Sequence, residues 1–204
     1  SGTSASANVA NGIAMSSNGN LALVDGTGLA SNYSLNSTVI NITPRVLNSS
    51  GSKIYDANTD ALAGAITLSN LVSGEALNHS GTATISSANA GSYTITNLAG
   101  ITIADGSGGA ASNYTLTGGT HNFTVNQRPL NATLARQYDG TTNAAGSDLS
   151  SFDALQGGET LTLSGSGTAA DDNVANGISV SSLGTLALVN GCLLYTSPSP
   201  RDLR

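Results

Sequence analysis

Two copies of one Tyr-Asp motif are the most conspicuous candidates for chemistry in this chain. Their side chains are Tyr55 and Asp56 in the first copy, and Tyr138, Asp139 and Gly140 in the second, 83 residues later. The phenol rings could contact a receptor, and the carboxylates could bind a metal. We favour structural roles, because the motif recurs once per repeat regardless of its neighbours. Each tyrosine is expected to pack on a small core with its hydroxyl at the rim. Each aspartate is expected to accept backbone N–H bonds in an Asx turn, with Gly140 supplying a positive φ.

A second polar and aromatic pair also recurs, as Asn32-Tyr33 and Asn113-Tyr114. Both pairs stand just before a short alternating segment near the end of a repeat. We interpret them as one structural device at the last strand.

Asp171, Asp172 and Asn173 carry the oxygen-rich side chains that calcium prefers. The Asp-x-Asp-x-Asp-Gly spacing and the bidentate glutamate of a dedicated calcium loop are missing, so calcium is a minority alternative. His79 and His121 stand without Cys or acidic partners at ligand spacing, which argues against zinc. We therefore expect no metal and no cofactor.

No residue pattern for catalysis stands out. The chain has no Gly-x-Ser-x-Gly elbow, and no Ser/His/Asp set occurs in a plausible order. No carboxylate pair suggests a general acid and base. The interpretation is a protein that is not an enzyme.

The composition indicates soluble β-structure. Only 9% of the 204 residues are charged, against about 25% in average proteins. Gly, Ser, Thr, Asn and Ala dominate, which suits short strands with polar outer faces and tight turns. The net charge of −6 comes without a basic stripe, so nucleic-acid binding is not expected. No apolar run approaches the roughly 20 residues of a membrane helix, so membrane insertion is not expected either.

Internal repetition divides the chain into modules. Residues 173–191 match residues 8–26 at an offset of 165, which is two periods of about 82. Pro44 and Pro129 stand at equivalent places and suit junctions between modules. The predicted parts are the C-terminal half of one module (1–44), a complete module (45–127) and an incomplete module (128–191).

Within a module, apolar residues alternate with polar ones, as in Tyr93 and Ile95, Ile101 and Ile103, or Leu161 and Leu163. Period-two alternation predicts strands with one face inward. A short helical turn would be unsurprising between Ala61 and Ala76. The expected fold is all-β: small antiparallel modules of about 80 residues, each a sandwich or β-grasp-like unit, in an elongated tandem array.

The motif order resembles a known repeat family. Tyr-Asp-Gly-Thr-Thr, then Gly-Glu-Thr-Leu-Thr-Leu-Ser-Gly, then Asp-Asn-Val-Ala-Asn-Gly-Ile, then Asn-Tyr-x-Leu resemble YDG-type repeats, to which MBG-type modules are related. Such repeats occur in filamentous-haemagglutinin-like bacterial adhesins exported by two-partner secretion. Ala57, where the motif usually has Gly, is one departure.

The resemblance implies a non-catalytic stalk or spacer in a secreted bacterial surface adhesin, located outside the cell or at its outer membrane. The alternative is that the modules themselves bind host glycans or proteins. The expected partners are neighbouring modules of the same chain and, in the alternative, a host glycan or protein.

Residues 192–204 break the compositional pattern. The run from Cys192 to Asp202, which includes the only cysteine, resembles the translation of a transposase sequencing adapter. We expect this tail to be non-native and exclude it from fold reasoning. The chain has no initiator Met and no signal-peptide pattern, so we expect an internal fragment of a longer protein.

Overall fold

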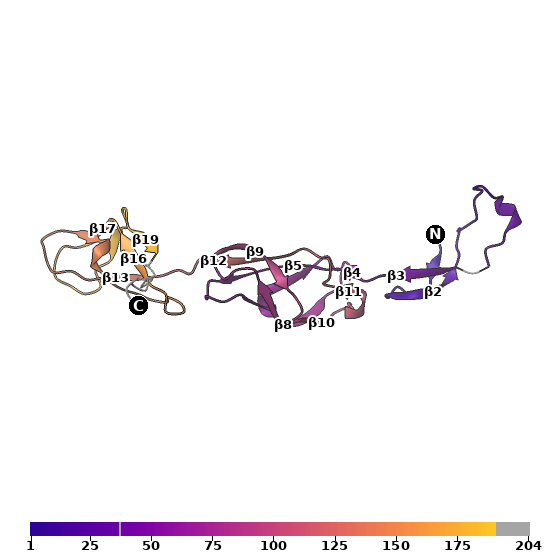
Figure 1. Ribbon diagram of the computed structural model, residues 1–204, viewed down its shortest axis with the longest axis horizontal. Coiled ribbons are helices and arrows are strands. Elements are labelled where there is room, and N and C mark those ends of the chain that lie inside the picture. Colours follow the sequence, from indigo (N-terminus) through magenta and orange to yellow (C-terminus); the bar gives the residue numbers. More distant parts are fainter. Residues whose placement is uncertain (37, 191–204) are drawn as a thin grey trace, which may run out of the picture. The chain divides into compact units, whose positions relative to one another are not determined.

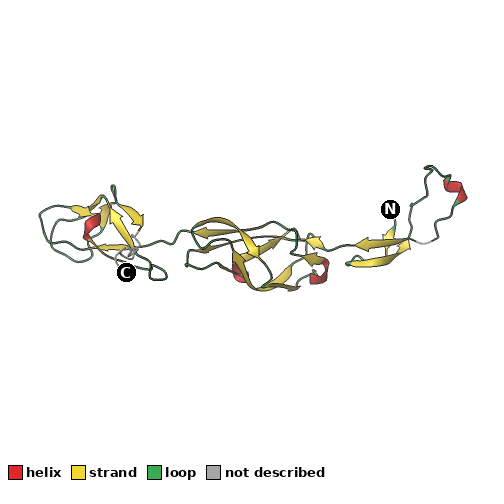
Figure 2. Cartoon of the chain, viewed as in Figure 1, coloured by secondary structure: helices red, strands yellow, loops and turns green. Residues whose placement is uncertain are grey.

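The computed structural model describes residues 1–36 and 38–190, and the chain divides into two compact units, residues 1–127 and 128–204. The adapter-like tail lies outside the described residues. Short strands joined by turns form both units (Figures 1 and 2). Helical structure in the described part of the chain is limited to 3₁₀ turns of three residues each. The fold is therefore all-β, as the alternating pattern predicts. No helix that the structure describes is long and apolar enough to span a bilayer.

The N-terminal part of the first unit is one small antiparallel sheet in the order β1-β2-β3. Its elements are β1 (Thr3–Ser4), β2 (Ala10–Ser17), the 3₁₀ turn η1 (Ala30–Asn32) and β3 (Val39–Ile42). Ile13 of β2 lies opposite Ile40 of β3 and is the one buried side chain among the described residues up to position 44. This small sheet therefore has almost no core of its own.

The central part of the first unit forms a strongly curved sheet in the order β10-β8-β9-β12-β5-β7, with β6 added to β8. Its elements are β4 (Arg45–Val46), β5 (Asn48–Ile54), β6 (Asp60–Leu62), η2 (Ala63–Ala65), β7 (Ile66–Ser69), β8 (Leu77–Ile85), β9 (Gly91–Asn97), β10 (Ile101–Asp105), η3 (Ala111–Asn113), β11 (Tyr114–Thr115) and β12 (His121–Asn126). The turn η2 lies in the segment where a helical turn was expected.

Two strand pairs in this part are parallel, which the expectation of an antiparallel module did not include. β12 runs parallel to β5, and β11 runs parallel to β4. These pairs join the last two strands of the module to its first two strands. All the other strands of the module lie between them in the sequence. The remaining pairs are antiparallel, and β8 with β9 is the one of them that a direct turn connects.

The core lies inside this curved sheet. Phe123 and Val125 alternate on β12 and are only 1% and 2% exposed. They belong to a buried cluster drawn from most of the strands: Ala61, Ala63, Ile66, Ala83, Ile85, Ile95, Ile101, Phe123 and Val125. Period-two alternation thus places one face of each strand inward, as predicted.

The second unit repeats part of the central arrangement. Its elements are β13 (Ala132–Leu134), β14 (Asn143–Ala145), η4 (Gly146–Asp148), β15 (Leu149–Phe152), β16 (Leu161–Ser164), β17 (Ser166–Ala169), β18 (Val180–Ser182) and β19 (Ala187–Asn190). The pair β13-β15 corresponds to β5-β7, the sheet β14-β17-β18 to β6-β8-β9, and the pair β16-β19 to β8-β10. The registers agree, since Ala61 faces Ala83 and Ala144 faces Gly167. No counterpart of β12 occurs within residues 128–190.

Candidate functional site

The two Tyr-Asp motifs form the same turn. Asp56 accepts the N–H of Asn58 at 3.2 Å, and Asp139 accepts the N–H of Thr141 at 3.0 Å. This is the Asx-turn arrangement that the sequence predicts. The residue after each aspartate has a positive φ, +61° at Ala57 and +72° at Gly140. The turn geometry is therefore kept even where glycine is replaced.

A cation three residues earlier holds each of these aspartates. The ammonium of Lys53 lies 2.8 Å from Asp56, and the guanidinium of Arg136 contacts Asp139. Partial burial by itself raises the pKa of Asp56, but the hydrogen bonds from Lys53 and Asn58 and the charge of Lys53 outweigh it and hold the pKa below the usual value. The pKa of Asp139 is lowered chiefly by the hydrogen bond from Arg136, and then by Thr141. Both carboxylates are thus committed to local contacts.

The two tyrosines differ in burial. Tyr55 packs partly buried against the core cluster, and its N–H donates to the carbonyl of Asn126 on β12 at 2.9 Å. Tyr138 is 64% exposed, which corrects the expectation that it packs on a core rim. The physical reason is the absence, within residues 128–190, of a strand like β12 beside it.

The Asn-Tyr pairs share a local backbone. Each ends a 3₁₀ turn whose first N–H donates to an upstream aspartate: Ala30 to Asp25 at 2.6 Å, and Ala111 to Asp105 at 2.7 Å. The asparagines differ in their partners. The backbone N–H of each asparagine donates to the carbonyl three residues earlier, Asn32 to Leu29 at 3.1 Å and Asn113 to Ala110 at 3.0 Å. The side chain of Asn113 in addition bonds the Asn8 side chain at 3.0 Å and accepts the Val9 N–H at 2.9 Å.

The tyrosines of these pairs differ more strongly. Tyr114 is 6% exposed; its hydroxyl donates to Glu75 and accepts the N–H of Val72 at 3.1 Å. The hydrogen bond to the Glu75 carboxylate raises the pKa of Tyr114. Tyr33 is 71% exposed.

The calcium candidates lie on an exposed loop. Asp171 accepts both the N–H of Asn173, at 2.9 Å, and its side-chain amide, at 2.7 Å. These bonds, the backbone one first, lower the pKa of Asp171. This is a third Asx turn. Across the described residues, no three His, Cys, Asp or Glu side chains gather closely enough to hold a metal ion.

Sequence reasoning missed several structural side chains. Arg45 donates from Nε to the carbonyl of Asn70 at 2.5 Å, and Arg128 donates to the carbonyl of Ala154 at 2.9 Å. Both acceptor residues have a positive φ, so each arginine braces a strained turn. In the sequence, an arginine stands beside each junction proline. Its hydrogen-bond partner becomes apparent only in the folded structure.

The two histidines also have structural partners. His121 bonds Ser49 through Nδ1 at 2.9 Å and lies 2.8 Å from the Leu116 carbonyl through Nε2. His79 lies 2.9 Å from the carbonyl of Ile66. His121 therefore links β12 to its neighbour β5, and His79 links β8 to β7, which is not its neighbour in the sheet.

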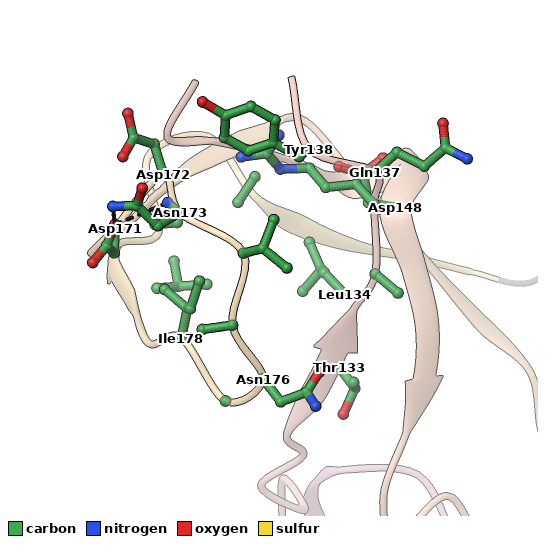
Figure 3. Close-up of a pocket in the computed structure, with 18 of the residues that line it drawn as sticks. Thr133, Leu134, Gln137, Tyr138, Asp148, Asp171, Asp172, Asn173, Asn176 and Ile178 are labelled. Atoms are coloured by element: carbon green, nitrogen blue, oxygen red, sulfur yellow. Dashed lines mark hydrogen bonds between the residues drawn. The ribbon is translucent and has the colours of Figure 1, made fainter. Parts of the chain in front are cut away.

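The second unit contains a cavity of about 640 Å³. One side of the cavity is formed by β13 and the segment that follows it. The other side is formed by the loop that carries Asp171, Asp172 and Asn173 (Figure 3). Its walls come from residues 132–138 on one side and 171–178 with Val180 on the other, and Ala144 and Ala169 also line it. Leu134 and Ile178 provide apolar surface, while Tyr138 and the aspartates stand at its border. The cavity thus brings together the predicted Tyr138 and the predicted 171–173 loop. Asp139 and Gly140 lie in the same unit outside the cavity lining, and the first unit holds the other predicted residues.

The chain was compared with protein families, curated proteins and solved structures. The YDG domain model matches residues 41–121 and again residues 124–192. No curated protein and no solved structure matches the chain. Two consecutive matches cover most of the sequence and coincide with the repeated Asx turns, arginine contacts and strand pairs, so the chain belongs to the YDG domain family.

Proposed function

We propose that this chain is a structural stalk or spacer region of a secreted bacterial surface adhesin. The observation that carries the proposal is the repetition of one module, with two consecutive YDG matches. The same Asx turn and the same contact between a cation and the aspartate recur in both copies. A spacer needs a module that repeats its fold, and its surface side chains can vary from copy to copy.

The location outside the cell and the adhesin context come from the resemblance to repeat regions of filamentous-haemagglutinin-like exoproteins. The low charge and the Thr- and Ser-rich strands fit that setting. In the described residues, the conspicuous carboxylates Asp56, Asp139 and Asp171 are engaged in turns, which supports a structural role over a catalytic one.

The proposal is tested by changing the number of modules. A variant with a second copy of residues 45–127 inserted after Gln127 is compared with the parent chain by small-angle X-ray scattering. A spacer is expected to gain a constant increment in maximum dimension for each added copy, with an unchanged melting temperature. An added copy that leaves the maximum dimension unchanged would contradict a spacer role.

The alternative function is direct binding of host glycans or proteins by the modules. The exposed ring of Tyr138 at the border of the 640 Å³ cavity favours this second candidate. A glycan array probed with the chain, and with a Tyr138→Ala variant, tests it. Saturable binding that the variant loses would support the binding role, and an array without signal would leave the spacer as the function.

A further inference from the structure

The junction at Pro44 is short, and the chain on both sides of it belongs to the first unit. Strand β3 ends at Ile42 and β4 begins at Arg45, so Thr43 and Pro44 alone connect them. Proline fixes its own φ and restricts the residue before it to extended conformations. The covalent connection therefore has little freedom, and a noncovalent contact beside it can fix the joint.

The loop of residues 5–9, between β1 and β2, stands on the side of the junction where the chain leaves the first module. Ala10, the first residue of β2, is paired with Ile42, the last residue of β3. The loop therefore lies beside the end of β3. The loop between β8 and β9 has the same place in the complete module, beside the end of β12, because Gly91 pairs with Val125.

The Asn-Tyr turn formed by η3 and β11 stands on the other side of the junction, where the chain enters the complete module. Tyr114 of β11 is paired with Arg45, the first residue of β4. The turn is held from within its own module, since the N–H of Ala111 donates to Asp105 at 2.7 Å. Asn113 is thus fixed next to the first strand after the junction.

The side chain of Asn113 bridges the two sides of the junction. Its Oδ1 accepts the N–H of Val9 at 2.9 Å, and its Nδ2 donates to Oδ1 of Asn8 at 3.0 Å. Because a backbone N–H can only donate, the first bond fixes which end of the Asn113 amide faces Val9. One amide therefore binds two consecutive residues of the loop through both of its polar atoms, which restricts the orientation of the partners as well as their distance.

Both sides of this contact recur in the chain. In each of the three loops, the backbone N–H of an asparagine donates to a side-chain oxygen two residues earlier: Asn8 to Ser6 at 3.1 Å, Asn89 to Ser87 at 3.2 Å, and Asn173 to Asp171 at 2.9 Å. The receiving turn recurs as well, because Asn32 and Asn113 each end a 3₁₀ turn whose first N–H donates to an upstream aspartate. The two recurring motifs thus match the two sides of one contact.

We propose that the Asn-Tyr turn is the docking site by which one YDG module binds the module before it. The partner is the loop that precedes β2 in the first module, and Asn113 is the residue that recognises its Asn8 and Val9. The joint at Pro44 is then held in one arrangement and is not a free hinge. This inference rests on the proposed spacer role and deepens it, because a spacer with held joints keeps its length.

The first test follows the Val9 amide by hydrogen exchange with NMR detection on the full chain. Asn113→Ala removes the acceptor of this amide and is expected to speed its exchange roughly two- to tenfold, the range of one net hydrogen bond. Asn8→Ala removes the other bond and leaves the acceptor of Val9, so it should speed the exchange less. The amide of Leu47, which donates to Thr115 at 2.8 Å within the complete module, shows whether the turn stays folded and should not change.

The second test measures the joint itself. Spin labels at Ala14→Cys on β2 and Ser50→Cys on β5, both exposed positions, give the distance distribution across the junction by double electron–electron resonance, with Cys192→Ser to remove the native thiol. The parent chain is expected to give one narrow peak, and Asn113→Ala a wider distribution. The matched control is Asn32→Ala, the equivalent residue of the other Asn-Tyr turn, which should leave the distribution unchanged.

Two results would overturn the proposal. If Asn113→Ala leaves either the Val9 exchange rate or the distance distribution unchanged, the turn does not hold the joint. If the protection of Val9 is lost on dilution, the turn docks a second chain and not the preceding module. The spacer role itself is tested by a different measurement, the gain in maximum dimension for each added module, so the two failures can be told apart.

Discussion

At the scale of single residues, position 57 is a natural test of the turn. Ala57 adopts a φ of +61° where the second copy has Gly140 at +72°. The left-handed region costs a non-glycine residue about 1–2 kcal/mol, and glycine avoids this cost. Glycine offsets part of the resulting stabilisation because its unfolded chain has more conformational entropy to lose. We expect Ala57→Gly to raise the free energy of unfolding by up to about 1 kcal/mol, and Gly140→Ala to lower it by a similar amount. Urea denaturation of both variants measures this. A destabilising Ala57→Gly would show that the turn does not fold as described.

The aspartates of the two turns predict a dependence on pH. Their pKa values are lowered in the folded state, so the folded chain binds fewer protons than the unfolded chain in acid. The stabilisation is therefore present above the unfolded pKa of about 4 and is lost as the pH falls through the folded-state values. We expect the melting temperature to decrease when the pH is lowered below about 4. The double variant Asp56→Asn with Asp139→Asn should have a lower melting temperature at pH 7 and a smaller further loss in acid.

The control for this pH dependence is Asp60→Asn, which removes a carboxylate next to the first turn without touching Asp56. Its acid transition should remain that of the parent chain. If the double variant still shows the full decrease in melting temperature in acid, other carboxylates determine the pH dependence.

Residue roles could be read from the sequence where the cause is local. The Asx turns at Asp56 and Asp139 need only neighbouring N–H groups, so the motif itself indicates them. Burial could not be read in the same way, because it depends on strands far away in the chain. Tyr138 has the same local motif as Tyr55 but stays exposed.

At the scale of elements, alternation in the sequence predicts the strands but not their partners. The parallel pairing of β5 with β12 joins residues about 70 positions apart, and no local signal specifies it. The cavity was not predicted because its walls, residues 132–138 and 171–178, come together only in the fold.

The closing strand β12 gives a prediction at this scale. Phe123 is buried among the core residues of the first unit, and removing most of its side chain leaves a cavity there. Phe123→Ala is expected to cost about 3–5 kcal/mol of unfolding free energy in that unit. The equivalent change Ile40→Ala, on a side chain that is 41% exposed, should cost less than about 1 kcal/mol.

The measurement is denaturant unfolding followed by hydrogen exchange, which reports the two units separately. The milder Phe123→Leu keeps the comparison usable if Phe123→Ala unfolds the first unit. Equal losses for Phe123→Leu and Ile40→Ala would show that β12 does not close the core.

At the scale of the whole molecule, stability is expected to be uneven along the chain. Of the thirteen buried apolar residues that the structure describes, eleven lie between Leu47 and Val125, with one more at Ile13 and one at Ala144. Because protection from exchange follows buried contacts and paired strands, amides of β5, β8, β9 and β12 should exchange slowest. Residues 1–44 and 128–190 should exchange faster, each having one buried apolar side chain. Native-state hydrogen exchange with mass spectrometry measures these exchange rates on the full chain. The variant Phe123→Leu should speed exchange in residues 45–127 and leave the exchange of residues 128–190 unchanged. Uniform protection from residue 1 to 190 would contradict it, because a chain with its core in one module cannot hold its other parts equally closed.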